Sequence, residues 1–407
     1  MLVEADSGKV LHAENATYPW YPASLTKLMT AYVALNAVRE GRMSIHSLVT
    51  MSARAHAQQP SKMGFKPGIQ LTLDNALKIL MVKSANDIAV AIAEGVSGSV
   101  ENFAEEMNGA AQRLGMTQSS FVNPNGLPDP RQISSARDMA ILARALIHEF
   151  PEHDLYWHIP AIKFGKRILR NYNRLIDRYA GADGMKTGFI CASGFNLVAS
   201  ATRHGRRLIS VVLGAPSSPV RAEKTARLLE SGFSNRGTLS WLTPSLGTVN
   251  SLVPIAAAPP DLHDQTCGPN RRRPASEADE EEVANNSDTT HSIHISSLQT
   301  PKAALIGPLV PSMPPIVVTL GPTKLTPKSD SPVIASAPLP LPRPTQASIN
   351  GAVAPTLAAS AFSRVTLASS PPATFAPSKS SNAVPLPRAR PHNKLARTKV
   401  GSKKRRR

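Results

Sequence analysis

Regular apolar periodicity runs from residue 1 to about residue 236 and then stops, and this break constrains the fold more than any other feature. The rest of the 407-residue chain carries most of the 36 prolines and long Ala/Ser/Thr/Pro tracts, a composition that cannot bury a core. We therefore expect a folded domain over residues 1–236 and a mostly disordered tail over residues 237–407 with a basic C-terminus.

The two cysteines, Cys191 and Cys267, lie one in each part, which excludes a disulfide scaffold or a four-cysteine metal site. A single disulfide between them is compatible with the sequence, although we expect Cys191 to be a small buried residue that fills space in the core. No window approaches the roughly 20 apolar residues of a membrane-spanning helix, and the N-terminus lacks the pattern of a leader. Because Met1 opens directly into strand-like sequence, we hypothesise that the true start lies upstream.

Helical periodicity marks the middle of the domain. A buried stripe at Leu28, Tyr32 and Leu35 predicts a helix over residues 24–38. Further helices are predicted over residues 72–82, 86–96, 100–115 and 135–147. Gly115 is expected to stop one of these helices, and Ser135 to cap another.

Strand-like patterns mark both ends of the domain. Residues 2–14 alternate around Asp6-Ser7-Gly8 as a hairpin would. Residues 184–215 form β-rich runs, the last two joined at His204-Gly205, and a helix ending at Gly232 follows. We predict an α/β (α+β) fold in which helices cover a central antiparallel sheet and the N-terminal hairpin pairs with the late strands.

The stretch YPASLTKLMTAYVAL places Ser24 and Lys27 one helical turn apart, so the amine can reach the hydroxyl. A serine at a helix N-terminus also gains from the positive end of the helix dipole, which stabilises a developing oxyanion. To act as a base, Lys27 must be neutral near pH 7, which requires burial or a second cation such as Lys186. Alone, this spacing is more often a helix cap with a surface lysine.

Two further motifs change that balance. KSAND places Ser84 and Asn86 in a tight link between two helices, and GMKTGF places Lys186 and Thr187 on a strand. Gly188 removes a side chain where a substrate backbone would lie against that strand. Three such motifs in this order indicate a catalytic serine rather than separate caps and surface cations.

The motifs SLTK, SAN and KTG resemble those of the serine penicillin-recognising enzymes. The flanking stretches VKSANDIAVAIAE, FVNPNGLP and DGMKTGFICASGFNLVASATRHGRRLISVVLGA are similar to D-alanyl-D-alanine carboxypeptidases of the low-molecular-mass penicillin-binding type. The resemblance covers residues 2–236 and implies a β-lactamase/transpeptidase-like fold with a helical subdomain. It also implies action on peptidoglycan stem peptides in the bacterial periplasm or cell envelope, with β-lactam antibiotics as inhibitors.

The resemblance also implies roles for single residues. Ser24 would be the acylated nucleophile, Lys27 its general base, and Ser84 a proton relay. Asn86 would bind the substrate amide. Lys186 and Thr187 would line a carboxylate pocket, and Arg221 would help to fix the terminal carboxylate. The backbone N–H groups of Ser24 and Phe189 would form an oxyanion hole, and Gly188 would leave room for the substrate. A surface position for Arg221 at a helix start is the alternative.

Three other functions compete with this one. A class A β-lactamase would need a glutamate between the second and third motifs, and only Glu149 and Glu152 stand after Met107 in that interval. A transpeptidase differs in acceptor access, which sequence does not show. A non-catalytic cell-wall-binding protein would not need an activated nucleophile.

No metal or other cofactor is expected, because the histidines form no zinc-binding motif. The formal charge of +18 is uneven: no acidic residue follows Asp330, and the chain ends in KKRRR. One hypothesis is a flexible tether that holds the protein near an anionic envelope surface, by an attraction that salt weakens. The other is a solvated tail without a partner. Nucleic acid is not an expected partner, because no sequence pattern of a folded nucleic-acid-binding domain accompanies the basic end.

Overall fold

The structure, a computed structural model, describes residues 1–234, 245–269 and 305–322. These residues all belong to one unit that extends from Met1 to Ser331. The predictions for residues 235–244, 270–304 and 323–407, including the basic end, lie outside the described residues. Within those described, no helix combines the length and the apolar character needed to cross a bilayer.

A five-stranded sheet in the order β2-β1-β9-β8-β7 forms the centre of this unit, and each neighbouring pair is antiparallel. The strands are β1 (Leu2–Glu4), β2 (Val10–His12), β7 (Ala182–Ile190), β8 (Gly194–Arg203) and β9 (Arg206–Ala215). Leu2 faces Ser210 across β1 and β9, so the N-terminal hairpin pairs with the last of the late strands. The predicted α/β fold with a central antiparallel sheet is confirmed.

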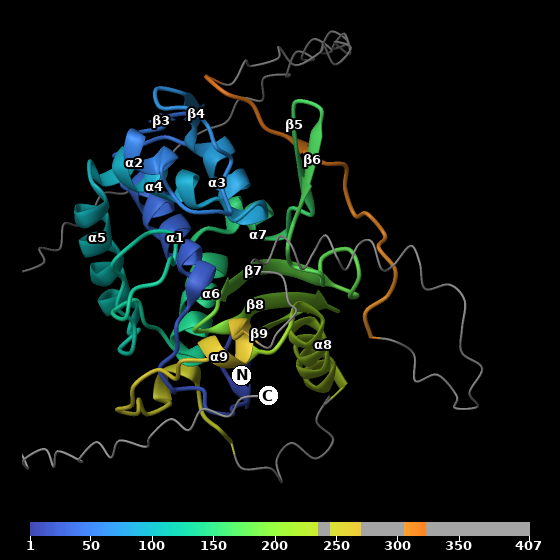
Figure 1. The fold of residues 1–407 in the computed structure, drawn as a ribbon. Coiled ribbons are helices and arrows are strands. Elements are labelled where there is room, and N and C mark those ends of the chain that lie inside the picture. The colour runs from blue at the N-terminus through green and yellow to red at the C-terminus, as the bar shows by residue number, and fades with distance from the viewer. Residues whose placement is uncertain (235–244, 270–304, 323–407) are drawn as a thin grey trace, which may run out of the picture. The chain divides into compact units, whose positions relative to one another are not determined.

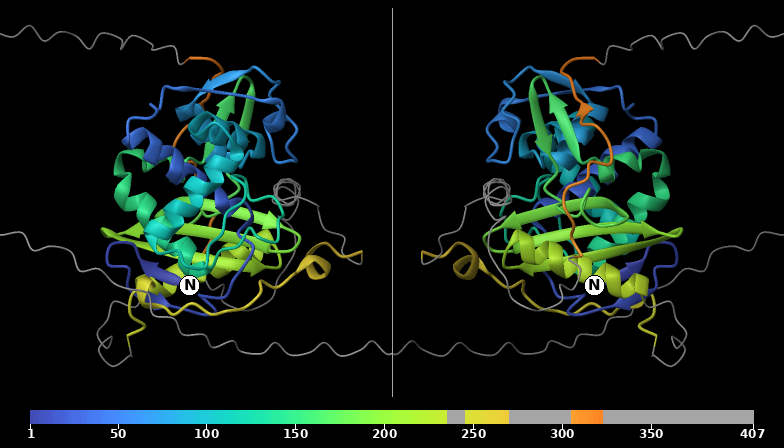
Figure 2. Two further views of the ribbon diagram at one scale, coloured as in Figure 1. Left: turned by 90° about the vertical axis from the view of Figure 1, so that its left-hand side faces the viewer. Right: turned by 90° about the vertical axis from the view of Figure 1, so that its right-hand side faces the viewer.

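Different helices cover the two faces of the sheet (Figures 1 and 2). Helix α8 (Ser218–Ser234) packs against one face, where Leu197 and Ala199 of β8 join its apolar cluster. Val198, between them in the chain, joins the larger cluster on the other face, under the remaining long helices. This alternation follows from the two-residue period of a strand.

The long helices of that second face lie where the periodicity predicts them. They are α1 (Thr26–Arg39), α3 (Leu73–Val82), α4 (Asn86–Ser97), α5 (Val100–Leu114) and α6 (Ala136–Glu149). The Ser135 hydroxyl accepts a hydrogen bond from Asp138 N at the start of α6, and Gly115 ends α5 with a φ of 76°. Helix α1 is buried on almost all sides, as expected of a helix at the centre of a core.

Helix α8 does not end at Gly232, which corrects the sequence prediction, because it continues to Ser234. A Cβ at Gly232 would lie 2.7 Å from side-chain atoms of both Leu2 and Leu208. The glycine therefore lets α8 approach the sheet closely and does not serve as a helix stop.

Several short elements were not predicted. Two hairpins flank the helices: β3 (Leu48–Thr50) with β4 (Gln70–Thr72), and β5 (Ala161–Phe164) with β6 (Arg167–Arg170). The short helices are α2 (Ala53–His56), α7 (Leu155–His158), α9 (His263–Cys267) and the 3-10 turns η2 (Pro151–His153) and η4 (Val249–Ser251).

Two stretches of the tail that was expected to be mostly disordered from residue 237 are structured. Cys267 forms a disulfide with Cys191, so Cys191 is not merely a buried filler. Residues 305–322 run along the domain, where β10 (Ile316–Val317) pairs in parallel with β5 and Val318 is buried (Figure 1). Both stretches are held by pairing with distant parts of the chain, which local composition does not reveal.

Candidate active site

Ser24 lies in a 3-10 turn, η1 (Ala23–Leu25), that leads directly into α1. Its side chain is partly exposed, whereas Ala23 and Leu25 are buried. Ala23 has a φ of 49°, a left-handed conformation that residues with a Cβ rarely adopt. The turn thus presents one hydroxyl at the surface of an otherwise buried segment.

Two glycines contact the backbone of this turn. A Cβ at Gly188 would lie 2.9 Å from Pro22 O and 3.0 Å from Ser24 N. A Cβ at Gly126 would lie 1.9 Å from Ala23 O, and Gly126 also has a φ of 80°. Gly188, predicted to leave room for a substrate backbone, therefore has a second role in the structure: it lets β7 approach the Ser24 turn.

Lys27 is fully buried at 0% exposure, and its Nζ contacts three oxygens. It lies 2.8 Å from Ser24 Oγ, 2.7 Å from Asn86 Oδ1 and 2.7 Å from Asn125 O. The last two are carbonyl oxygens, which only accept hydrogen bonds, whereas the serine hydroxyl can also donate. The two carbonyls can take two N–H groups of the amine, and the third contact places Nζ within reach of the Ser24 hydroxyl proton.

Asn86, the first residue of α4, is buried, and both ends of its side-chain amide are engaged within the protein. Oδ1 accepts from Lys27, and Nδ2 donates to Gln59 O over 2.9 Å. One N–H of the amide therefore remains for a substrate. The structure supports a part for Asn86 in orienting Lys27, beyond the substrate contact that the sequence suggested.

Ser84 lies in the link between α3 and α4 with a φ of 57°. Lys186 on β7 donates a hydrogen bond from Nζ to Ser84 Oγ over 2.9 Å, and both residues are buried. The second and third motifs are thus joined directly, as Ser24 and Lys27 are within the first. Asn86 links the two pairs, because it stands two residues from Ser84 and contacts Lys27.

The edge strand β7 supplies the remaining predicted residues. Thr187 is 1% exposed, and its Oγ1 has no hydrogen-bond partner among the described residues. A buried hydroxyl without a partner is costly unless a ligand satisfies it. Phe189 is partly exposed, and its ring packs on Phe195 with centroids 4.3 Å apart.

Arg221 lies in the first part of α8 and is 1% exposed, which rules out the surface alternative. Its guanidinium donates to Asn196 O and to Ser218 Oγ, each over 3.2 Å. It also lies over the Phe195 ring at 5.7 Å. The cation therefore sits against β8, the strand next to β7.

Sequence reasoning missed two asparagines that hold the site. Asn125 accepts a hydrogen bond from Lys27 through its backbone oxygen. Every residue type has this oxygen, so the sequence cannot indicate the contact. Asn196 on β8 is fully buried, and its Nδ2 donates to Tyr21 O over 3.0 Å, which ties the segment before Ser24 to the sheet. Its Oδ1 accepts from Gly214 N, so one side chain joins three segments.

The glutamates of the β-lactamase alternative are engaged elsewhere. Glu149 forms a 2.9 Å ion pair with Arg39 and accepts hydrogen bonds from the Tyr32 hydroxyl. Burial and this neighbouring carboxylate raise the pKa of Tyr32. Arg39 stands 12 residues after Lys27 on α1, about 18 Å along the helix axis. Glu152 lies in η2 and is exposed. Neither is placed to activate water at Ser24.

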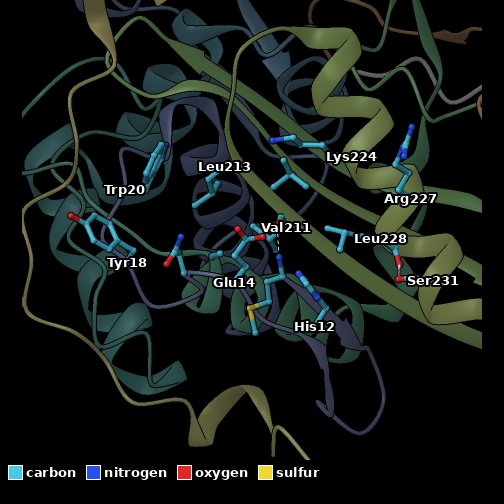
Figure 3. A pocket seen from close by; sticks show the side chains of 14 residues that line it. His12, Glu14, Tyr18, Trp20, Val211, Leu213, Lys224, Arg227, Leu228 and Ser231 are labelled. Carbon is cyan, nitrogen blue, oxygen red and sulfur yellow. Dashed lines mark hydrogen bonds between the residues drawn. The ribbon is translucent and has the colours of Figure 1, made fainter. Parts of the chain in front are cut away.

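No group of three or more His, Cys, Asp or Glu among the described residues could hold a metal ion. A cavity of about 600 Å³ lies away from Ser24, between the N-terminal segment, β9 and α8 (Figure 3). Tyr18 and Trp20 stand on one side of it and Lys224 and Arg227 on the other. It contains none of the motif residues, so the candidate site is the Ser24–Lys27 cluster.

Comparison with known families and curated proteins supports the same region. The model of the peptidase S11 family, D-alanyl-D-alanine carboxypeptidase, matches residues 1–217. D-alanyl-D-alanine carboxypeptidase DacC of Escherichia coli K12 is 40% identical over 260 residues, which cover 62% of this chain and 65% of that protein. DacA of Haemophilus influenzae is 40% identical over 60% of this chain and 63% of its own length. The chain thus spans just under two thirds of these relatives.

Solved structures agree in fold. Penicillin-binding protein 5 of Haemophilus influenzae is 39% identical with a TM-score of 0.55, covering 57% of this chain and 69% of that one. Penicillin-binding protein D2 of Listeria monocytogenes, in its cefotaxime-bound form, is 30% identical with a TM-score of 0.52, covering 57% of this chain and 95% of that one.

Proposed function

The chain belongs to the peptidase S11 family of D-alanyl-D-alanine carboxypeptidases, and from this membership we propose that it removes the terminal D-alanine from peptidoglycan stem peptides through an acyl-enzyme on Ser24. The observation that carries the proposal is the fully buried Lys27 amine held 2.8 Å from Ser24 Oγ. Burial disfavours the charged form of an amine, so Lys27 can accept the hydroxyl proton as Ser24 attacks.

The reaction proceeds in two steps, acylation of Ser24 and hydrolysis of the acyl-enzyme. Ser24 Oγ bonds to the carbonyl carbon of the scissile amide, its proton passes to Lys27, and the negative charge collects on the carbonyl oxygen. The backbone N–H groups of Ser24 and Phe189 stabilise that oxyanion. The amide C–N bond then breaks, and the leaving D-alanine amine takes a proton. Water next cleaves the ester and restores the Ser24 hydroxyl.

Ser84 completes the proton path. Its hydroxyl, held by Lys186, can pass a proton toward the leaving amine and later help to orient water. The terminal carboxylate of the substrate binds at Lys186 and at Thr187 Oγ1, which has no partner among the described residues. Arg221 adds positive charge from behind β8.

A β-lactam offers a carboxylate beside a strained amide and therefore acylates Ser24 by the same steps. Relatives of the fold include a penicillin-binding protein solved with cefotaxime bound. The slow step with such a compound is release of the acyl group. β-Lactam antibiotics are thus inhibitors in this proposal rather than preferred substrates.

The setting of the activity is also a proposal. Residues 1–236 form the catalytic domain, braced by the stretches at 245–269 and 305–322. The protein acts in the periplasm or cell envelope, where peptidoglycan is remodelled and cell shape is maintained. The basic C-terminus serves as a tether to an anionic envelope surface. Equal sedimentation with anionic vesicles, with and without residues 379–407, would remove the tether from the proposal.

Two measurements on the full chain test the function. A labelled penicillin followed by mass mapping of the adduct should place the label on Ser24, and a stem peptide ending in D-Ala-D-Ala should release D-alanine. A Ser24→Ala variant should lose both signals while it still binds the peptide. Label on another residue overturns the site, and turnover by Ser24→Ala overturns the mechanism. Peptide binding without D-alanine release in the unmodified chain would favour the wall-binding alternative.

A further inference from the structure

A cluster of three cations lines a small cavity beside the candidate active site. Lys62, Lys83 and Arg167 surround about 40 Å³ of space, together with partly buried apolar residues of which Phe164 and Leu169 belong to the β5–β6 hairpin. None of the three cations has a carboxylate within ion-pair distance among the described residues. The β5–β6 hairpin stands beside α3 (Figure 1).

Unpaired cations normally spread apart on a surface, because like charges repel. Here they converge on one cavity with an apolar wall, which lowers the local dielectric and strengthens attraction for an anion. Surrounding positions increase the effect, because the hairpin sequence KFGKRILR has four cations and no acid.

The cavity adjoins the motif residues through the backbone. Lys83 directly precedes Ser84, and Lys62 directly follows Ser61. The Ser61 hydroxyl donates to Lys83 O over 3.0 Å, and Ser61 O accepts from Asn86 N over 2.7 Å. The two lysines are thus each one residue from a segment that fixes Ser84 or Asn86.

Each lysine keeps hydrogen-bonding capacity for a ligand. Lys83 Nζ donates to the Tyr172 hydroxyl over 2.6 Å, and Lys62 Nζ donates to His56 O over 3.1 Å. An ammonium has three N–H groups, so two remain on each. The cavity has room for about three water-sized groups, which suits a carboxylate and excludes a sugar ring.

We propose that Lys62, Lys83 and Arg167 form a binding subsite for a carboxylate on the acyl-donor peptide, upstream of the terminal D-Ala-D-Ala. This inference rests on the proposed function, because it assigns specificity within the same site. It adds a second, cationic binding point for a carboxylate to the one that Lys186 and Thr187 give the terminal carboxylate. A peptide with both anionic groups is then fixed at two points across the scissile bond.

The test uses the full chain and pairs of synthetic peptides ending in D-Ala-D-Ala. The two peptides of a pair differ in one side chain, which is a carboxylate in one peptide and the corresponding carboxamide in the other. Three pairs are needed, one for each of the three residues before D-Ala-D-Ala. The measured quantity is the ratio of kcat/KM for acid over amide. The unmodified protein should prefer the acid about tenfold at one position, as a charge-assisted hydrogen bond allows.

Variants separate this subsite from general charge. Lys83→Gln should reduce the ratio to below twofold, and Arg167→Gln, at an exposed position that cannot disturb the fold, to about threefold. Lys166→Gln is the matched control: it removes one charge from the same hairpin at a residue that does not line the cavity, and it should keep the full ratio.

Acylation by benzylpenicillin, which has no upstream carboxylate, gives the independent readout of the proposed function. Variants that keep the acylation rate within twofold but lose the acid preference support the subsite. A ratio near one in the unmodified protein, or an unchanged ratio in Arg167→Gln, overturns it. If neither peptide is hydrolysed, the proposed function fails, and competition of the acid and amide peptides against penicillin labelling still decides the subsite.

Discussion

Gly188→Ala tests how the Ser24 turn and the β7 strand are placed relative to each other. The new Cβ would lie 2.9–3.0 Å from Pro22 O, Ser24 N and Leu25 N, where ordinary van der Waals contact begins at 3.4 Å. All three atoms belong to the backbone, so no side chain can rotate away. Strand and turn must separate by about 0.5 Å to reach ordinary contact distance.

This separation moves the two proposed oxyanion donors, because Ser24 is on the turn and Phe189 follows Gly188 on the strand. A misplacement of about 1 Å costs about 100-fold in rate, and loss of one oxyanion donor costs about 100- to 1000-fold. For half that displacement we expect acylation by a labelled penicillin to fall about 10-fold, or about 1.4 kcal/mol. Overpacking should also lower the free energy of unfolding by about 1–3 kcal/mol.

Gly109→Ala is the matched control for this substitution. Gly109 lies within α5, and the atom nearest to its added Cβ would be Arg113 Nη1 at 3.5 Å, at the end of a flexible side chain. Alanine is the better helix former by up to about 1 kcal/mol, so this variant should melt at a higher temperature with an unchanged acylation rate. If Gly188→Ala acylates within twofold of the unmodified protein, the argument that this contact positions the donors is wrong.

Three further predictions concern stability. Cys267→Ser removes a disulfide that closes a loop with a sequence separation of 76, and it should lower the free energy of unfolding by about 3–4 kcal/mol in chemical denaturation. A reductant should have the same effect on the unmodified protein and none on the variant. Burial raises the pKa of Glu4, but hydrogen bonds, chiefly from Ser7 and Arg206, outweigh this effect and keep the pKa below its usual range. The ionised carboxylate therefore stabilises the fold above about pH 4, and this stabilisation is lost as pH falls through the folded-state pKa. Glu4→Gln should lower the free energy of unfolding by about 0.5 kcal/mol at pH 7 and leave it unchanged at about pH 2. Val318→Asp places a charge at a buried position beside β5 and should speed amide exchange in that strand, and unchanged exchange would show that residues 305–322 do not hold the hairpin.

The long elements could be predicted because each carries its own signal. Ser135 caps α6 through a contact three residues away, and Gly115 ends α5 by its own backbone conformation. The β5–β6 hairpin carries no such signal, since its strands have four residues each and are rich in cations. β10 has two residues and exists only because β5 lies beside it, more than 150 positions earlier in the chain.

The candidate site divides in the same way. The i, i+3 spacing of Ser24 and Lys27 predicts their contact, because a helix fixes that distance. The partners that reach the site through backbone oxygens, such as Asn125, depend on the path of a loop and not on a residue type. Gly188 shows that a residue type does not reveal every reason for its presence: the neighbouring turn also requires the glycine, which the sequence did not indicate.

Backbone strain is concentrated at the two segments that carry the serines. Five non-glycine residues among those described have a positive φ. Three of them are asparagine, aspartate or histidine, which adopt this conformation more readily than other types. The other two are Ala23, next to Ser24, and Ser84 itself. Each such residue costs about 1–3 kcal/mol and persists only where its surroundings fix it. Here the surroundings are the buried helices α1 and α4 and the contact with Gly126, so the strength of the core determines how firmly both hydroxyls are aimed at Lys27 and Lys186.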